Sequence, residues 1–293
     1  MSPVRKGVAS AIGAFFLWGL LPIFWKSLHF LPPATIIAQR TLWSMLLLLP
    51  LIAWRGQFRE VSRVLITRQG FTWQLLSGSL LASNWLLYVW ATLNGRILEG
   101  ALGYYLNPFF NMLFGALFFG ERQTRRQLIA VAVALVGVGC QFPSVNGPPW
   151  VALALALTFS LYAVVRKKAA LGALGGLAAE TALLAPIAAS WLLWQHHQNN
   201  TLAGHSIGEF WLVAATGLAT ATPLLLFNHA TRSIPLTTLG MLQFLGPTLQ
   251  FMVGWGFYGE PMNGSRLISF ALIWLAIAIH TSRFRSRPAI APE

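Results

Sequence analysis

Ten apolar segments of membrane-spanning length follow one another along this chain of 293 residues. Hydrophobic residues make up 56 % of the chain and charged residues only 9 %, against roughly 25 % charged residues in soluble domains. A helix needs about 20 apolar residues to cross the hydrocarbon, and roughly 17 still suffice. The sequence therefore predicts ten transmembrane helices, over residues 7–28, 33–54, 70–94, 99–119, 127–142, 149–166, 174–195, 210–229, 235–257 and 264–281.

The basic residues gather in alternate loops between these segments. Of the 20 Lys and Arg residues, all but four fall in or beside the loops on the side that carries the N-terminus; Lys26, Arg96 and Arg266 fall on the opposite side, and Arg40 lies within a span. Cytoplasmic loops carry such an excess, so we expect both termini to be cytoplasmic. The basic clusters are short and form no continuous face for nucleic acid.

The two halves of the chain repeat one another at an offset of about 139 residues. Five residues of the first half, Pro108, Gly115, Phe118, Gly120 and Glu121, recur as Pro247, Gly254, Phe257, Gly259 and Glu260. The halves are residues 5–142 and 148–283, connected near 143–149. Because each half has an odd number of spans, the second copy inserts upside down. The predicted fold class is an all-α integral membrane protein of two inverted five-helix repeats, a transporter architecture.

Amide and aromatic side chains within the spans form the predicted solute-binding set. Such groups are costly in lipid unless they face the bundle interior. They either line a cavity or form interhelical hydrogen bonds, and the sequence leaves both readings open. Tyr104, Asn107 and Asn111 share one face of the fourth span, and the set is completed by Trp18, Asn84, Tyr88 and Gln243.

Two prolines, Pro108 and Pro247, occupy matching positions in the fourth and ninth spans. A proline removes a helical hydrogen bond, and we expect each to break its helix. The break is either a structural kink or the discontinuous helix that marks a transporter's midplane site. The glycine of each Gly-Glu pair is expected to end its span, and the glutamate, placed before the next helix, to act as a cap.

Arg40 and Glu180 are ionisable residues at equivalent places in the second and seventh spans. Each lies about six residues from a membrane face, and the two faces are opposite, so roughly 12 Å separates them in depth. We therefore do not expect a direct ion pair. Arg40 either snorkels to the outer interface or anchors an anionic group of the solute. Glu180 is the candidate for proton coupling.

Small residues, Ala130, Ala134, Gly137 and Gly139, pattern the fifth span. They permit close approach of another helix, either within the molecule or across a homodimer. The single cysteine, Cys140, excludes an internal disulfide.

The Gly-Glu pairs, Asn107-Pro108 and the five-plus-five layout resemble the EamA domains of the drug/metabolite transporter superfamily. Several strings are similar to the RarD subfamily: Gln39-Arg40-Thr41-Leu42-Trp43-Ser44, Asn84-Trp85-Leu86-Leu87, Leu102-Gly103-Tyr104-Tyr105-Leu106-Asn107-Pro108, Val165-Arg166-Lys167-Lys168, Glu180-Thr181 and Phe257-Tyr258-Gly259-Glu260. The resemblance covers residues 5–283. It implies a permease of the bacterial inner membrane, often labelled chloramphenicol-sensitive or chloramphenicol-resistance, and does not supply the natural substrate.

The function we expect is secondary transport of a small organic metabolite or drug-like solute by alternating access, as efflux through proton antiport or facilitated flow. The sequence carries no nucleotide-binding loop or metal-ligand cluster, so we expect no cofactor, no metal and no enzyme activity. One alternative is a non-transporting membrane assembly or sensor protein. Another is a membrane-embedded enzyme on lipid-linked substrates, which would need the acid, base or metal cluster that the scattered His and Glu residues do not form.

Overall fold

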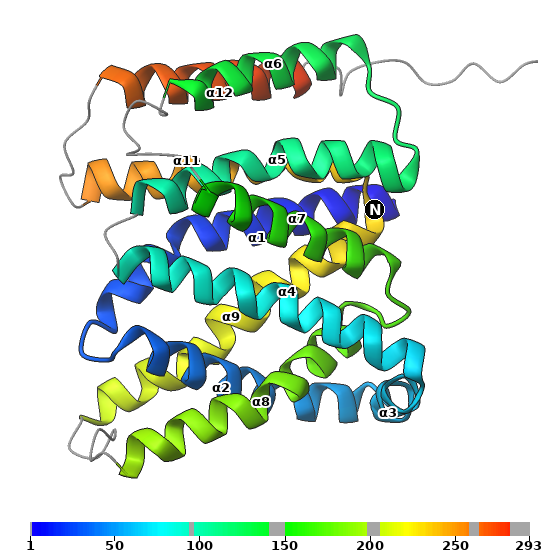
Figure 1. Cartoon of the computed structure of the whole chain (residues 1–293), viewed down its shortest axis with the longest axis vertical. Helices are drawn as coiled ribbons and strands as arrows, with labels where there is room; N and C mark the ends of the chain where they lie inside the picture. The colour runs from blue at the N-terminus through cyan, green and yellow to red at the C-terminus, as the bar shows by residue number, and fades with distance from the viewer. Residues whose placement is uncertain (1, 94–96, 141–149, 198–205, 258–263, 282–293) are drawn as a thin grey trace, which may run out of the picture.

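The computed structural model describes residues 2–93, 97–140, 150–197, 206–257 and 264–281, and every regular element in these ranges is helical (Figure 1). The helices are α1 (Pro3–Ser27), α2 (Pro33–Trp54), α3 (Phe58–Ile66), α4 (Arg68–Leu93), α5 (Ile97–Phe119), α6 (Arg125–Gly139), α7 (Trp150–Lys168), α8 (Ala173–His197), α9 (Ile207–Ser233), α10 (Leu236–Gln243), α11 (Leu245–Met252) and α12 (Gly264–Thr281). A π-helical segment, Val253–Phe257, continues α11. The expected all-helical fold is confirmed for these residues.

Helices occupy each of the ten segments that the apolar runs predict, and one further helix, α3, was not predicted. This short helix lies in the cationic stretch between the second and third segments. Its apolar residues occupy one face only, and Val61 on that face packs against Leu171 and Ala179. A search for long apolar runs passes over such a helix, because its other face is charged.

The two repeated prolines differ in their effect on the helices. Of the two kinds of break expected at Pro108, the discontinuous helix is absent, because α5 runs without interruption from Ile97 to Phe119. One missing hydrogen bond is tolerated there within a packed helix. In the second half the helix is interrupted, but at Phe244, between α10 and α11. Pro247 follows in the first turn of α11, where a helix has no partner for the missing N–H group in any case.

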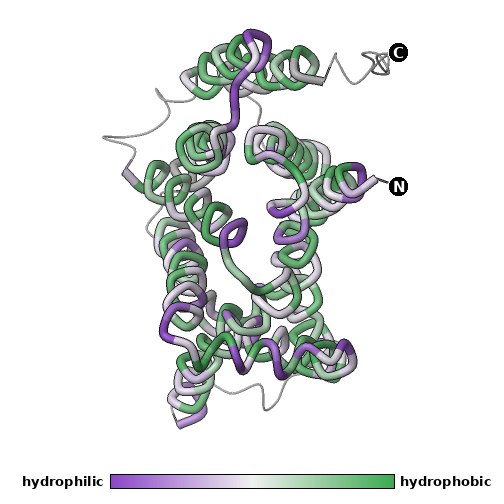
Figure 2. Tube along the Cα trace, turned by 90° about the vertical axis from the view of Figure 1, so that its right-hand side faces the viewer, coloured by the Kyte–Doolittle hydropathy of each residue, from purple (hydrophilic) through white to green (hydrophobic). Residues whose placement is uncertain are grey.

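The outer surface of the helices is apolar. Within the described residues, five helices are long and apolar enough to cross a membrane by length and composition: α1, α2 from Ala34, α7, α8 and α9. Large hydrophobic side chains stand exposed on the periphery, among them Leu86, Ile187 and Trp211 at 68 %, 70 % and 64 %. Figure 2 shows hydrophobic residues on nearly all helices, seen there almost end-on. A water-soluble protein rarely exposes so much apolar surface, so lipid covers this one.

The helices of the two halves pack in a reciprocal pattern. Helix α1 of the first half packs on α9 and α11 of the second half, and α7 of the second half packs on α4 and α5 of the first. Helix α2 packs on α8 and α9, while α8 packs on α2 and α4. Helix α5 packs on α10, and α6 packs on α12 in a separate layer at the top of Figure 1. When α1, α2, α4, α5 and α6 are exchanged for α7, α8, α9, α10–α11 and α12, the contacts of α1 with α9 and α11 become those of α7 with α4 and α5. The contact of α2 with α9 becomes that of α8 with α4, while α2 on α8, α5 on α10 and α6 on α12 map onto themselves.

The small residues of α6 serve packing within the molecule. Ala130, Ala134 and Gly137 are buried. A Cβ atom built at Gly137 would lie 3.0 Å from the Ser269 carbonyl oxygen of α12. No atom lies within 4 Å of the same position at Gly139.

Candidate functional site

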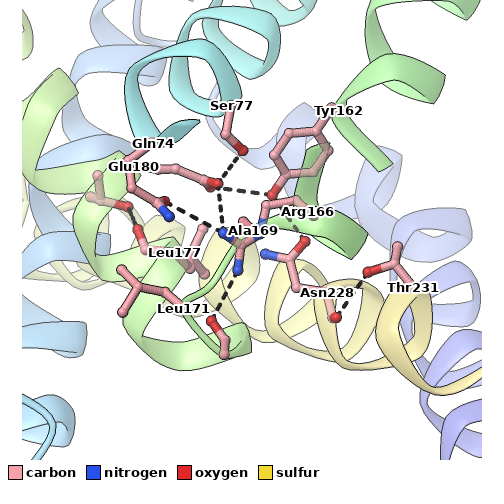
Figure 3. A network of polar contacts seen from close by, with 12 residues as sticks. Gln74, Ser77, Tyr162, Arg166, Ala169, Leu171, Leu177, Glu180, Asn228 and Thr231 are labelled. Atoms are coloured by element: carbon pink, nitrogen blue, oxygen red, sulfur yellow. Dashed lines mark hydrogen bonds and ion pairs between the residues drawn. The ribbon is translucent and has the colours of Figure 1, made fainter. Parts of the chain in front are cut away.

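A network of buried polar side chains surrounds Glu180, on the second turn of α8 (Figure 3). Arg166, from the end of α7, places Nη1 3.3 Å from Glu180 Oε1, and both side chains are almost wholly buried. Ser77 of α4 donates a hydrogen bond to the same carboxylate. The Tyr162 hydroxyl lies 3.3 Å from Glu180 Oε2. We call these four residues, with Asn228 of α9, the Glu180 network.

Tyr162 links the Glu180 carboxylate to α9. Its hydroxyl lies 3.0 Å from Oδ1 of Asn228 as well as 3.3 Å from Glu180. A hydroxyl has one hydrogen and donates to one acceptor at a time. Rotating the Asn228 amide would place its unpartnered Nδ2 beside the hydroxyl, and Tyr162 would then donate to Glu180. The state of the carboxylate is therefore coupled to the side-chain arrangement between α7 and α9.

Glu180 is the one residue of this network that the sequence indicates as a candidate; Ser77, Tyr162, Arg166 and Asn228 were not predicted, and Arg166 was counted among the basic residues of the cytoplasmic side. The side chain is fully buried, and its Nη2 donates to the Gly172 carbonyl oxygen at 2.9 Å. The guanidinium occupies the space that a Cβ atom at Gly176 would need. The signal was available: Arg166 and Glu180 lie near the ends of two helices joined by a short loop, so both sit close to the same face.

Arg40 does not contact Glu180, in agreement with the depth argument. Its guanidinium carbon lies 4.0 Å from the ring centre of Trp85 and 5.3 Å from that of Trp25. Tyr104 is close enough to interact with Arg40 electrostatically, and the Tyr104 ring lies 5.6 Å from that of Tyr88. We call these five residues the Arg40 site.

A narrow pocket lies between the Arg40 site and the Glu180 network. It encloses about 300 Å³ of empty space including its mouth, but its width leaves room for only about one water molecule. Trp85 of the Arg40 site and Glu180 of the Glu180 network both line it. The lining comes from α2, α4, α8 and α9: Thr41, Ser44, Leu81, Trp85, Leu177, Glu180, Thr181, Leu184, Thr220, Ala221 and Leu224. The Thr220 hydroxyl is buried and has no hydrogen-bond partner.

The predicted amides lie in several places and do not line this pocket. Asn111 Nδ2 donates to Gln243 Oε1 at 2.8 Å, which joins α5 to α10. Asn84 Nδ2 donates to the Leu155 carbonyl oxygen at 2.9 Å, so it holds α4 against α7. The Asn107 side chain is fully buried, and neither of its amide atoms has a partner. Three of the four amides, Asn84, Asn111 and Gln243, thus form hydrogen bonds between helices, the second of the readings that the sequence left open.

Trp18 lies in an aromatic cluster between α1, α7 and α9. Its ring centre is 5.8 Å from that of Phe159 and 5.5 Å from that of Phe227. The side chain therefore takes part in packing the core and lies outside the pocket lining.

A second polar cluster joins the two halves at the ends of their helices. Gly120 ends α5 with a positive φ of 62°, as expected for a helix stop. Glu121 then caps α10 of the other half, and not α6, which has its own capping box in Thr124 and Gln127. The Glu121 carboxylate accepts hydrogen bonds from the Leu236 and Thr237 N–H groups, at 2.8 and 3.0 Å. We call this contact the Glu121 cap; Gly259-Glu260, the second pair, lies outside the described residues.

Electrostatics favours the ionised form of Glu121. Lys167, at the end of α7, places Nζ 3.2 Å from Glu121 Oε1. Burial alone would raise the pKa of Glu121, but the hydrogen bonds from Thr237 and Leu236 and the charge of Lys167 outweigh it and hold the pKa below its ordinary value of 4.5. The carboxylate is therefore charged at neutral pH and ties the ends of α5, α7 and α10 together.

Comparison with known proteins agrees with this fold and its apolar surface. A model of the EamA-like transporter family matches residues 5–140. A solved crystal structure, 20 % identical, aligns with 96 % of this chain and 99 % of its own at a TM-score of 0.72, which shows a shared fold. The chain belongs to the EamA-like transporter family and is a multi-pass membrane protein.

Relatives narrow the assignment within that family. Protein RarD of Salmonella typhimurium is 38 % identical over 94 % of each chain. The uncharacterized transporter PA0485 of Pseudomonas aeruginosa is 42 % identical over 95 % of this chain and 94 % of its own. The chloramphenicol-sensitive protein RarD of the same species is 30 % identical, covering 94 % of this chain and 93 % of its own. The chain is an EamA permease of the RarD-like type.

Proposed function

We propose that the protein is a secondary transporter that exports a small organic solute across the bacterial inner membrane by alternating access. The moving units are the two five-helix halves, residues 5–142 and 148–283, inserted in opposite orientations with both termini in the cytoplasm. The observation that carries the proposal is the pocket between α2 and α4 of one half and α8 and α9 of the other, with a buried carboxylate in its wall. Binding sites of transporters with inverted repeats lie at such an interface.

The reciprocal packing of the helices supports the inverted repeat. Contacts between α1 and α9 have their counterpart between α7 and α4, as an internal two-fold relation requires. A rocking motion of one half against the other would exchange the two sets of contacts. It would open the pocket to one side while closing it to the other.

The Glu121 cap is the inner gate in this scheme. It connects α5 of the first half to α10 of the second through backbone and side-chain hydrogen bonds. It lies where cationic helix ends meet, the side that the charge distribution assigns to the cytoplasm. Opening toward the cytoplasm would separate Glu121 from the first turn of α10.

Glu180 is the proposed site of proton coupling. A proton on Glu180 would neutralise the carboxylate and weaken its attraction to Arg166, 3.3 Å away. Tyr162 connects this event to α9, which lines the pocket. Protonation would thus change the packing between helices of the second half and the wall of the binding site.

Transport assays test the proposal directly. Purified protein in liposomes is expected to move an amphipathic solute when a proton gradient is imposed; the name of one relative makes chloramphenicol the first to try. Glu180→Gln is expected to remove the dependence of transport on the gradient. If Glu180→Gln transports with the same pH dependence as the wild type, proton coupling at this residue is wrong.

Labelling of the pocket tests the transport pathway without a known solute. In a Cys140→Ser background, Ser44→Cys and Thr220→Cys are expected to react with a water-soluble thiol reagent, since both positions line the pocket. Ala134→Cys, buried in α6 and outside the pocket lining, is the unreactive control. No labelling at either pocket position, together with no solute movement under any ion or proton gradient, would favour a non-transporting assembly protein.

A further inference from the structure

We infer that the solute of this transporter carries an anionic group, a carboxylate or its equivalent, bound by Arg40 between the rings of Trp25 and Trp85. This inference rests on the proposed function and specifies its substrate class. It concerns a cation for which the described residues provide no counter-charge. The apolar body of the solute would extend along the pocket that Trp85 lines.

Arg40 has no acidic partner in the part of the chain that the structure describes. The ion pairs found among the described residues join Arg166 to Glu180 and Lys167 to Glu121, and neither involves Arg40. The Nε atom of Arg40 is buried and has no hydrogen-bond partner. Arginine stays charged in proteins and carries five N–H donors. Donors are therefore free to receive a ligand.

The guanidinium of Arg40 lies beside Trp25, two residues before the end of α1, and closer still to Trp85 of α4. Its nearest ring belongs to Trp85, eight residues before the end of α4, which corresponds to about 12 Å of helix. A side chain that snorkels would turn toward the helix end instead. The structure thus favours the second reading of Arg40 that the sequence left open, an anchor within the bundle.

The surroundings of Arg40 suit a ligand anion better than a permanent protein partner. Stacking on tryptophan faces orients a guanidinium and leaves its N–H edge free. That edge binds a carboxylate through two parallel hydrogen bonds. Because Glu180 is already paired with Arg166, Arg40 leaves a net positive charge beside the pocket. An anionic solute would neutralise it.

The pocket beside this anchor has mainly apolar walls. Thr41 follows Arg40 in sequence and lines the pocket, as does Trp85, which also stacks on the guanidinium. The unpartnered hydroxyl of Thr220 is part of the same lining. The geometry therefore fits an anionic head on Arg40, an apolar or aromatic body, and one polar contact along its length.

Matched pairs of probes that differ only in charge test the inference. We would measure binding of benzoate against benzamide, and of phenylpropanoate against phenylpropanamide, to the purified protein by tryptophan fluorescence and thermal shift. The carboxylate of each pair is expected to bind about 10- to 100-fold more tightly, the contribution of a charge-assisted hydrogen bond. Equal affinity within both pairs, or binding of neither member, would overturn the inference.

Variants of Arg40 locate the effect. Arg40→Gln is expected to abolish the preference for the carboxylate, and Arg40→Lys to retain part of it, because lysine keeps the charge and loses the planar fork. Arg126→Gln removes the same charge from an exposed position at the start of α6 and should leave the preference unchanged. A preference that survives in Arg40→Gln would refute the assignment.

Stability of the ligand-free protein gives a readout that needs no ligand. An unpaired cation kept for binding destabilises the empty protein, so Arg40→Gln is expected to raise its melting temperature. A lower melting temperature would show that Arg40 serves packing between Trp25 and Trp85, against the inference. If the protein transports neutral solutes alone, the anionic substrate is refuted and the proposed transport function stands. If it binds anions and transports no solute, the proposed transport function is refuted instead.

Discussion

The ion pair between Arg166 and Glu180 should be the most sensitive contact of the bundle to single substitution. The exposed fractions of the two side chains are 0 % and 1 %, and 3.3 Å separates their charged groups. Arg166→Met leaves the Glu180 carboxylate in a dry site with only Ser77 and Tyr162 as donors. Removal of one partner from a buried pair costs about 3–5 kcal/mol. For a chain of this size that is on the order of a 10 °C fall in melting temperature.

The double variant separates pairing from packing. Arg166→Met with Glu180→Met replaces the pair by apolar side chains of similar size, and such replacement is often neutral. We expect the double variant to be more stable, by about 3 kcal/mol or more, than the sum of the two single losses in unfolding free energy would predict. Equilibrium unfolding in mixed micelles measures this difference. Arg126→Met, the same substitution at an exposed position, is expected to change stability by less than about 0.5 kcal/mol. Additive losses in the double variant would refute the reasoning.

Three further predictions concern the Glu121 cap and helix packing. Glu121→Ala should lower the free energy of unfolding by about 1–2 kcal/mol, as expected for the loss of a helix cap. Glu60→Ala, at an exposed position, should lower it by less than about 0.5 kcal/mol. Equal effects of the two substitutions would contradict the assignment of Glu121 as a cap of α10. Because the folded pKa of Glu121 lies below 4.5, the contribution of its carboxylate to stability is complete above pH 4.5 and disappears as the pH falls through the folded pKa. The unfolding free energies of wild type and Glu121→Ala, measured at about pH 7, 5 and 3, should therefore converge in acid. A difference that stays constant with pH would contradict this prediction. Gly217→Ala should destabilise the protein by about 1–3 kcal/mol, because the new Cβ would lie 2.5 Å from the Trp43 backbone. Gly139→Ala, where the new Cβ meets open space, should be neutral or stabilising by up to about 1 kcal/mol. Thermal shift distinguishes the two variants, and similar shifts would refute the close contact at Gly217.

The positions of the helices followed from the sequence because their cause is local. A long apolar run in lipid must satisfy its own backbone hydrogen bonds, so it forms a helix wherever it occurs. The stop at Gly120 was predictable for the same reason, since a positive φ at a helix end favours glycine. Helix α3 and the interruption at Phe244 were not, because neither carries a comparable local signal.

The partners of the polar side chains were decided by the tertiary structure. From the sequence, Glu180 was an isolated carboxylate. In the fold it meets Arg166, because a short loop brings the end of α7 next to the start of α8, where the glycine at position 176 leaves room for the guanidinium. Arg40 stayed ambiguous until the ring of Trp85 was placed beside it.

The sequence by itself determined an all-helical membrane protein with its apolar segments and its polar residues at known depths. Only the tertiary structure decided which of those residues meet. Glu121 shows the difference: its place after Gly120 marked a cap, but the helix it caps, α10, comes from the other half of the chain. The physical reason is that backbone hydrogen bonds form within a segment, while side-chain contacts depend on how helices distant in sequence rotate and cross.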